Sequence, residues 1–157
     1  MPSSLYDRDL YDWAMQSARL VRERRFSELD LEHLAEELES RGKSEVRALE
    51  SRLTVLLAHL LTWQFQPERR GKSWRRTLIE QRKRIARLLR DSPSLEPRLL
   101  DVVADAYDSA MRLAADETGL DESDFPPSCP YRMDQALDEG FYPDSDEGAG
   151  STPLEWG

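Results

Sequence analysis

One stretch of the sequence, from Leu53 to Phe65, constrains the fold more than any other. Its apolar residues fall on nearly every side of a helix rather than on one stripe, and a helix with that pattern is buried all round. We therefore predict that residues 44–65 form the central core helix. Pro67 ends this helix, because proline lacks a backbone donor and clashes with the preceding turn. The predicted core consists of Leu53, Leu56, Leu57, Leu60 and Leu61.

The rest of the chain carries a helical period and no strand pattern. Apolar residues recur at the spacing of amphipathic helices over 5–24, 30–42, 73–89 and 94–119, whereas no useful length alternates with period two. We predict an all-α fold, a compact bundle of four to five helices with a C-terminal arm and a short terminal helix over 130–137. The predicted N-caps are Asp30, Ser44, Ser73 and Ser94, with an interruption at Gly42 and a C-terminal stop at Gly119.

The length of 157 residues is typical of one domain. No cofactor is needed to explain folding at this length, and we expect none. We predict a single helical domain over 1–143. From Asp138 onward the chain contains six acidic residues and no basic one, and we expect a disordered acidic tail over 144–157.

Three features of the sequence bear on its compartment. Cys129 is the only cysteine, so no internal disulfide can form, which favours a reducing environment. The first nine residues lack the basic start and apolar run of a secretory signal. The apolar stretch that begins at Leu53 is shorter than the roughly 20 residues that a membrane span needs. We therefore expect a cytoplasmic protein with no membrane contact.

Charge is distributed unevenly along the chain. The net charge is −9, yet residues 69–90 contain ten Lys or Arg and one acid, against 12 basic and 30 acidic residues elsewhere. Such a stripe suits contact with phosphate groups, so the predicted helix 73–90 is a candidate nucleic-acid surface. The alternative is neutralisation within the bundle or a dimer, where Arg82, Arg84 and Arg87 would pair with carboxylates of 36–39 or 101–108. We expect Arg82 and Arg84 to be engaged internally. The candidate anion-binding residues are Arg69, Arg70, Lys72, Arg76, Lys83, Arg87 and Arg90.

Arg52 and His59 are the candidates for catalysis. An imidazole in the buried helix is a suitable general base, because its pKa moves easily across neutrality. The spacing of the two residues resembles the Arg–His signature of small metal-independent ribonucleases of toxin–antitoxin systems. The alternative, which we favour, is a core histidine that forms a hydrogen bond with a neighbouring helix. The pair Asp30 and His33 suggests no metal site, because Asp30 is better used as an N-cap and the pair lies on a polar face.

Several segments carry a family resemblance through their order and spacing. They are LAEELESRG (34–42), SRLTVLLAHLLTWQFQP (51–67), SW (73–74), EQR (80–82), DSPSL (91–95), ETGL (117–120) and the FP and CPY pairings within 125–131. Together they resemble the bacterial domain-of-unknown-function family 29 over residues 5–143. The resemblance implies a compact helical domain, common in bacteria, with no assigned reaction, ligand or partner, and no functional residues to carry over.

Composition, charge and motifs together favour a non-catalytic helical interaction or regulatory module whose partner is another protein. Two alternatives remain open from the sequence. One is a ribonuclease that uses Arg52 and His59, and the other is a nucleic-acid-binding module that uses the basic helix 73–90. A homodimer is compatible with each of these predictions.

Overall fold

The computed structural model describes residues 4–144. Within this range the chain forms six α-helices and four single-turn 3-10 helices and no strand, which confirms the predicted all-α fold. The 3-10 turns are Phe26–Glu28, Pro67–Arg69, Pro93–Leu95 and Glu122–Asp124. The chain divides after Ser44 into two compact units, called here the N-terminal unit and the C-terminal unit. Apart from Asp144, the predicted tail lies outside the described residues.

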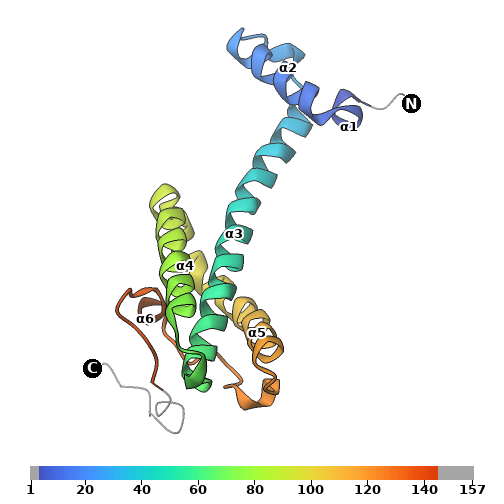
Figure 1. Cartoon of the computed structure of the whole chain (residues 1–157). Coiled ribbons are helices and arrows are strands. Elements are labelled where there is room, and N and C mark those ends of the chain that lie inside the picture. Colours follow the sequence, from blue (N-terminus) through green and yellow to red (C-terminus); the bar gives the residue numbers. More distant parts are fainter. Residues whose placement is uncertain (1–3, 145–157) are drawn as a thin grey trace. The chain divides into compact units, whose positions relative to one another are not determined.

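The N-terminal unit contains α1 (Leu5–Arg8), α2 (Leu10–Arg22) and the first part of α3 (Leu31–Phe65) (Figure 1). The prediction of one helix over 5–24 is wrong, because the helix breaks at Asp9. The Asp9 carboxylate accepts a hydrogen bond from the backbone N–H of Asp12 and so caps α2. The predicted cap at Asp30 is confirmed, since its carboxylate accepts a hydrogen bond from the His33 backbone N–H at 3.3 Å.

The C-terminal unit is built around the second part of α3. The helices α4 (Lys72–Asp91) and α5 (Arg98–Thr118) pack against it, and α6 (Met133–Leu137) follows near the C-terminus (Figure 1). All five predicted core leucines are fully buried. Small side chains on α5, at Ala106, Ala110 and Ala114, are also fully buried and allow the helices to pack closely.

Several predicted helix ends are wrong. Helix α3 runs through Gly42 without a break, so Ser44 caps nothing. An interior glycine costs about 1 kcal/mol relative to alanine, which the long flanking helical segments tolerate. The N-caps of α4, α5 and α6 are Gly71, Pro97 and Arg132. Gly119, with φ 75°, ends α5 as predicted.

Within residues 4–144, none of the helices combines the length and the apolar character that crossing a bilayer requires.

Candidate functional site

The N-terminal unit has very little interior of its own. Helix α2 turns Trp13 and Ser17 toward its neighbours, and these are the buried residues of α2, each 7% exposed. The Trp13 ring meets the edge of Tyr6 with centroids 4.9 Å apart, and Tyr6 stacks on His33 at 4.0 Å. A single aromatic cluster therefore holds α1, α2 and the start of α3 together.

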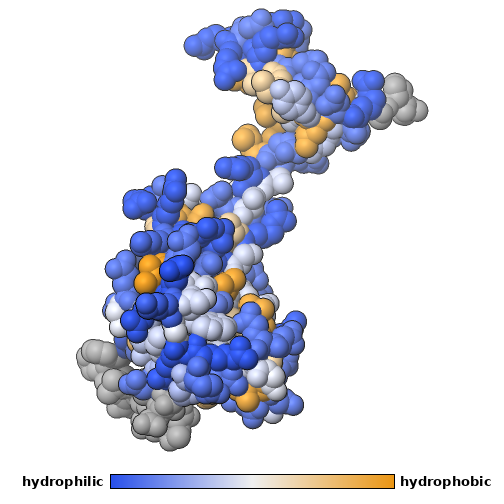
Figure 2. Space-filling model, viewed as in Figure 1, coloured by the Kyte–Doolittle hydropathy of each residue, from blue (hydrophilic) through white to orange (hydrophobic). Residues whose placement is uncertain are grey.

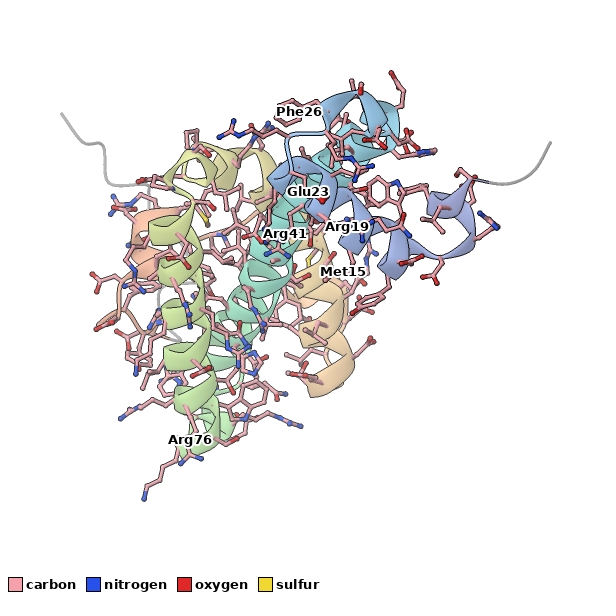
Figure 3. All side chains as sticks on the ribbon, turned by 90° about the horizontal axis from the view of Figure 1, so that it is seen from above. Met15, Arg19, Glu23, Phe26, Arg41 and Arg76 are labelled. Atoms are coloured by element: carbon pink, nitrogen blue, oxygen red, sulfur yellow. The ribbon has the colours of Figure 1, made fainter. Side chains whose placement is uncertain are left out.

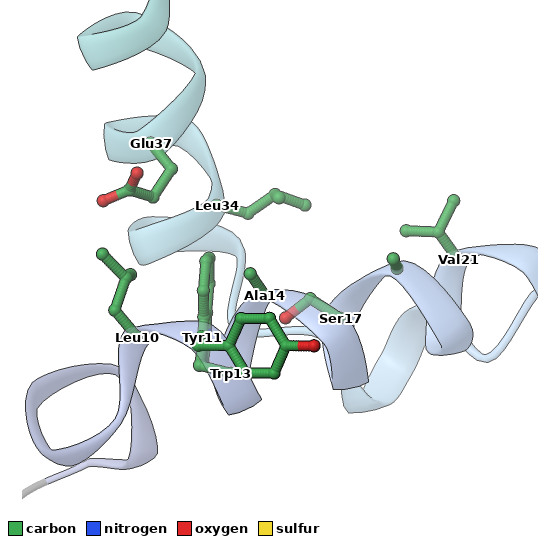
Figure 4. A pocket seen from close by; sticks show the side chains of 9 residues that line it. Leu10, Tyr11, Trp13, Ala14, Ser17, Val21, Leu34 and Glu37 are labelled. Atoms are coloured by element: carbon green, nitrogen blue, oxygen red, sulfur yellow. The ribbon is translucent and has the colours of Figure 1, made fainter.

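An open groove of about 520 Å³ lies along this unit. Its walls are mainly apolar and come from α2 and from the first turns of α3. Leu10 and Val21 lie toward its two ends, and Leu34 reaches over it from α3 (Figure 4). Glu37 is the single charged residue in its lining. A groove of this kind suits an apolar helical side-chain ridge better than a polar small molecule.

The apolar exposure of the described chain is concentrated in this unit. Nine large apolar residues are exposed within residues 4–144, and seven of them belong to the N-terminal unit. These seven are Leu10, Tyr11, Met15, Val21, Phe26, Leu31 and Leu38. Figure 2 shows apolar atoms at the surface of these helices among the charged ones. A concentration of exposed apolar side chains of this kind is typical of an interaction site.

A polar cluster borders the groove. The Tyr6 hydroxyl donates a hydrogen bond of 2.6 Å to the Glu37 carboxylate, which raises the pKa of Tyr6 to about 12. The Nδ1 atom of His33 bonds to the Asp30 carboxylate, and this bond raises the pKa of His33. The Tyr6–Glu37 bond joins residues 31 positions apart and fixes the start of α3 beside α1, whereas the Asp30–His33 bond is local to the first turn of α3.

In the C-terminal unit, the buried Arg82 fastens the C-terminal arm to α4. Its guanidinium donates to the backbone carbonyls of Ala136 at 2.9 Å and Phe141 at 2.7 Å, with a longer contact of 3.4 Å to Glu139. Burial lowers the pKa of Arg82. Internal engagement of Arg82 is therefore confirmed, but its expected carboxylate partners are wrong, because backbone carbonyls of the arm occupy that position.

Next to this contact, aromatic rings and cations form a second cluster. Trp63 and Tyr142 pack with ring centroids 5.0 Å apart, and the Arg75 guanidinium lies 5.4 Å from the Tyr142 ring. The Nε atom of Arg70 donates to the Trp63 carbonyl at 2.7 Å. A cavity of about 400 Å³ opens between Trp63, Arg70, Gly71, Lys72 and Arg75. The predicted anion-binding residues Arg70 and Lys72 therefore meet at one cavity.

The other predicted anion-binding residues lie on the surface. Arg76, Lys83, Arg87 and Arg90 are all exposed on α4, and Arg76 extends away from its helix (Figure 3). Arg69, just before α4, is exposed and bonds to the Gln66 side chain at 2.8 Å. Arg84 is not engaged internally, contrary to expectation, because it pairs on the surface with Glu80 of its own helix at 2.7 Å. Arg87 likewise pairs with Asp91 of its own helix, not with distant carboxylates.

His59 and Arg52 are not joined within the described part of the chain. The His59 Nδ1 atom lies 2.8 Å from the Val55 carbonyl, so this nitrogen carries the proton, and the ring packs on Trp74 at 4.4 Å. Burial lowers the pKa of His59. The hydrogen bond runs within α3, not to a neighbouring helix. Neither Arg52 nor His59 lines the two cavities described above.

A family model described as a domain of unknown function, DUF29, matches residues 5–142 of the chain. The chain belongs to the DUF29 family. No curated protein and no solved structure matches it. The match covers both structural units, so the groove of the N-terminal unit and the basic stripe of α4 are both parts of this DUF29 domain.

The groove of this DUF29 domain was missed by the sequence analysis, although a signal for it exists. Apolar residues of α2 occupy more than one stripe, since Tyr11 and Met15 lie on the other side of the helix from Trp13 and Leu20. A helix that packs on a neighbour with one side only needs a single apolar stripe, so a second stripe indicates a second contact surface.

Among residues 4–144, the structure contains no group of three or more His, Cys, Asp or Glu placed to hold a metal ion.

The two histidines of the DUF29 domain are expected to titrate on opposite sides of their ordinary pKa of about 6.5. The Asp30 hydrogen bond raises the pKa of His33, so its stabilising contribution is complete below 6.5 and disappears as the pH rises through the shifted pKa. Burial lowers the pKa of His59, so the stability that its neutral form provides is present above 6.5 and is lost as the pH falls below it.

Proton NMR of the imidazole Cε1–H signals measures both titrations. His33→Gln and His59→Gln assign the two signals, because the chain has only these two histidines. Two midpoints on the same side of 6.5 would contradict one of the two environments described above.

Proposed function

We propose that this domain is a non-catalytic interaction module that assembles with other helices through its N-terminal unit. The observation that carries the proposal is the concentration of exposed apolar side chains on α2 and the start of α3, around the 520 Å³ groove. Covering such a face with another apolar helix removes it from water at a gain of about 25 cal/mol per Å². The recognition mode is a helix packed along a groove formed by two helices.

A site-specific photocrosslinker tests this function. The reactive residue replaces Met15, which is 54% exposed on α2, and in a matched control it replaces Ile79, which is 40% exposed on α4. Illumination in lysate of the native host should give protein adducts at position 15 that Val21→Glu removes and that position 79 does not give. Equal adduct patterns at the two positions, or adducts insensitive to Val21→Glu, would refute an interaction surface here.

A second candidate function is nucleic-acid binding along α4. It is favoured by the exposure of four cations, Arg76, Lys83, Arg87 and Arg90, which repeat along one side of a helix. Lys72 lies on the same side, and at 1.5 Å per residue the stripe from 72 to 90 is about 27 Å long. Contacts of this type bind phosphates without reading sequence.

Replacing these four cations with glutamine is expected to change the free energy of unfolding by no more than about 1 kcal/mol, because exposed ion pairs contribute little. The same variant should lose RNA affinity and show a smaller dependence of that affinity on salt, as measured by fluorescence anisotropy. Unchanged affinity and salt dependence would exclude α4 as the binding surface. A matched variant in which four exposed cations outside α4 become glutamine, at Lys43, Arg47, Arg98 and Arg112, removes the same charge and controls for net charge.

A further inference from the structure

Helix α2 has two apolar sides with different surroundings. One side carries the buried Trp13 and Ser17, which contribute to the interior of the N-terminal unit. The other side is exposed and carries Leu10, Tyr11, Ala14, Met15 and Val21. Ala14 and the half-buried Ala18 stand one turn apart near its middle. Small residues at that point allow the backbone of another helix to approach closely.

Charge along α2 changes sign from one end to the other. Asp9 and Asp12 stand at its start, and Arg19 and Arg22 lie in its last turn. Asp12 and Arg19 are seven residues apart, which is close to two full turns, so they lie on the same edge of the helix. This edge borders the exposed apolar side. The helix is therefore complementary in charge to a copy of itself that runs in the opposite direction.

We propose that the occupant of this face is a second copy of the chain, with the two α2 helices antiparallel about a two-fold axis. This inference rests on the proposed function and names its partner. In an isologous contact the same edge of each helix faces its counterpart, so Asp12 faces the partner's Arg19 and Arg19 faces the partner's Asp12. A parallel two-fold pair would instead place the edge that carries Asp12 and Arg19 beside the opposite edge of the partner helix, so these two residues would not pair.

The start of α3 extends the same contact. Leu31 and Leu38 are 65% and 66% exposed, and they belong to the N-terminal unit, as α2 does. Two helical hairpins that pair through such faces form a four-helix arrangement with a continuous apolar centre. The N-terminal unit buries few apolar side chains on its own. Pairing of two copies would give it the apolar interior that so small a unit needs for stability.

Charge reversal tests the antiparallel pair in the full chain by sedimentation equilibrium. Asp12→Arg and Arg19→Asp, each alone, convert two attractive contacts per dimer into two repulsive ones. Each is expected to raise the dimer Kd by about tenfold or more. An equimolar mixture of the two single variants restores both attractive contacts and should form a mixed dimer with a Kd near that of the wild type. The double variant, Asp12→Arg with Arg19→Asp, should likewise recover self-association.

A second measurement keeps the test decisive if a charge reversal lowers the helix content seen by circular dichroism. In a Cys129→Ser background, Asp12→Cys mixed with Arg19→Cys should form an inter-chain disulfide under mild oxidation far faster than Asp12→Cys alone. Equal rates would contradict the antiparallel register.

Different results would refute the antiparallel dimer and the interaction module. A wild-type chain that stays monomeric at about 0.5 mM, above the dissociation constants of ordinary specific complexes, refutes the second copy. Adducts to other proteins at position 15 would then still support the interaction module. Dimerisation with identical Kd values for all charge variants also refutes this arrangement, because the contact would lie elsewhere. Absence of both self-association and position-15 adducts refutes the proposed function itself.

Discussion

Arg82→Ala is expected to lower the free energy of unfolding of the C-terminal unit by about 2–4 kcal/mol, because hydrogen bonds from a charged donor contribute about 1.5–3 kcal/mol each and are not fully additive. Arg82 is 3% exposed, and its guanidinium donates to the carbonyls of Ala136 and Phe141 at 2.9 and 2.7 Å. Its removal leaves these acceptors without their donor and frees the arm from α4. Urea denaturation followed by circular dichroism measures the loss.

Arg84→Ala is the matched control for Arg82→Ala. It removes the same side chain from the same helix two positions away, where it makes only an exposed ion pair with Glu80, and should cost less than about 0.5 kcal/mol. Arg82→Lys should fall between these values, since an ammonium lacks the planar fork that spans several carbonyls. Equal losses for Arg82→Ala and Arg84→Ala would show that the arm is held by its apolar contacts alone.

The helical fold could be predicted from the sequence because its core residues recur at the spacing of an α-helix. The leucines of α3 recur at helical spacing on all sides, and such a pattern admits only a buried helix. The helix ends were predicted less well. Ser73 and Ser94 were predicted as N-caps, but α4 and α5 begin after Gly71 and Pro97. The exact start of a helix depends on the backbone conformation of the preceding segment, and the spacing of apolar side chains carries no information about it.

The partners of Arg82 and the groove on α2 could not be predicted for a related reason. The pattern around Arg82 indicates a cation beside the apolar stripe, but its acceptors lie 54 to 59 residues later in the chain. Their position follows from the packing of the arm. Likewise, the period of α2 identifies an apolar face but not how much of it a neighbour covers. Whether Tyr11 and Met15 are buried is a property of tertiary packing, not of helix amphipathicity.

Leu57→Ala is expected to destabilise the protein by about 2–5 kcal/mol, the range for removing a fully buried leucine side chain and leaving a cavity. Leu57 is fully buried in the part of α3 around which the C-terminal unit is built. Its neighbours on α3 are long leucines whose rotamers are fixed by the helix, so the cavity cannot close without moving a backbone. The midpoint and slope of urea denaturation measure the change.

Two controls separate burial from helix propensity in this test of Leu57. Leu100→Ala makes the same chemical change on α5 of the same unit, at a position that is 76% exposed, and should alter stability by less than about 0.5 kcal/mol. Leu57→Met keeps the volume and should cost less than about 1.5 kcal/mol. If Leu57→Ala and Leu100→Ala gave the same small loss, α3 would not be the core of the C-terminal unit, and the packing of α4 and α5 against it would be refuted.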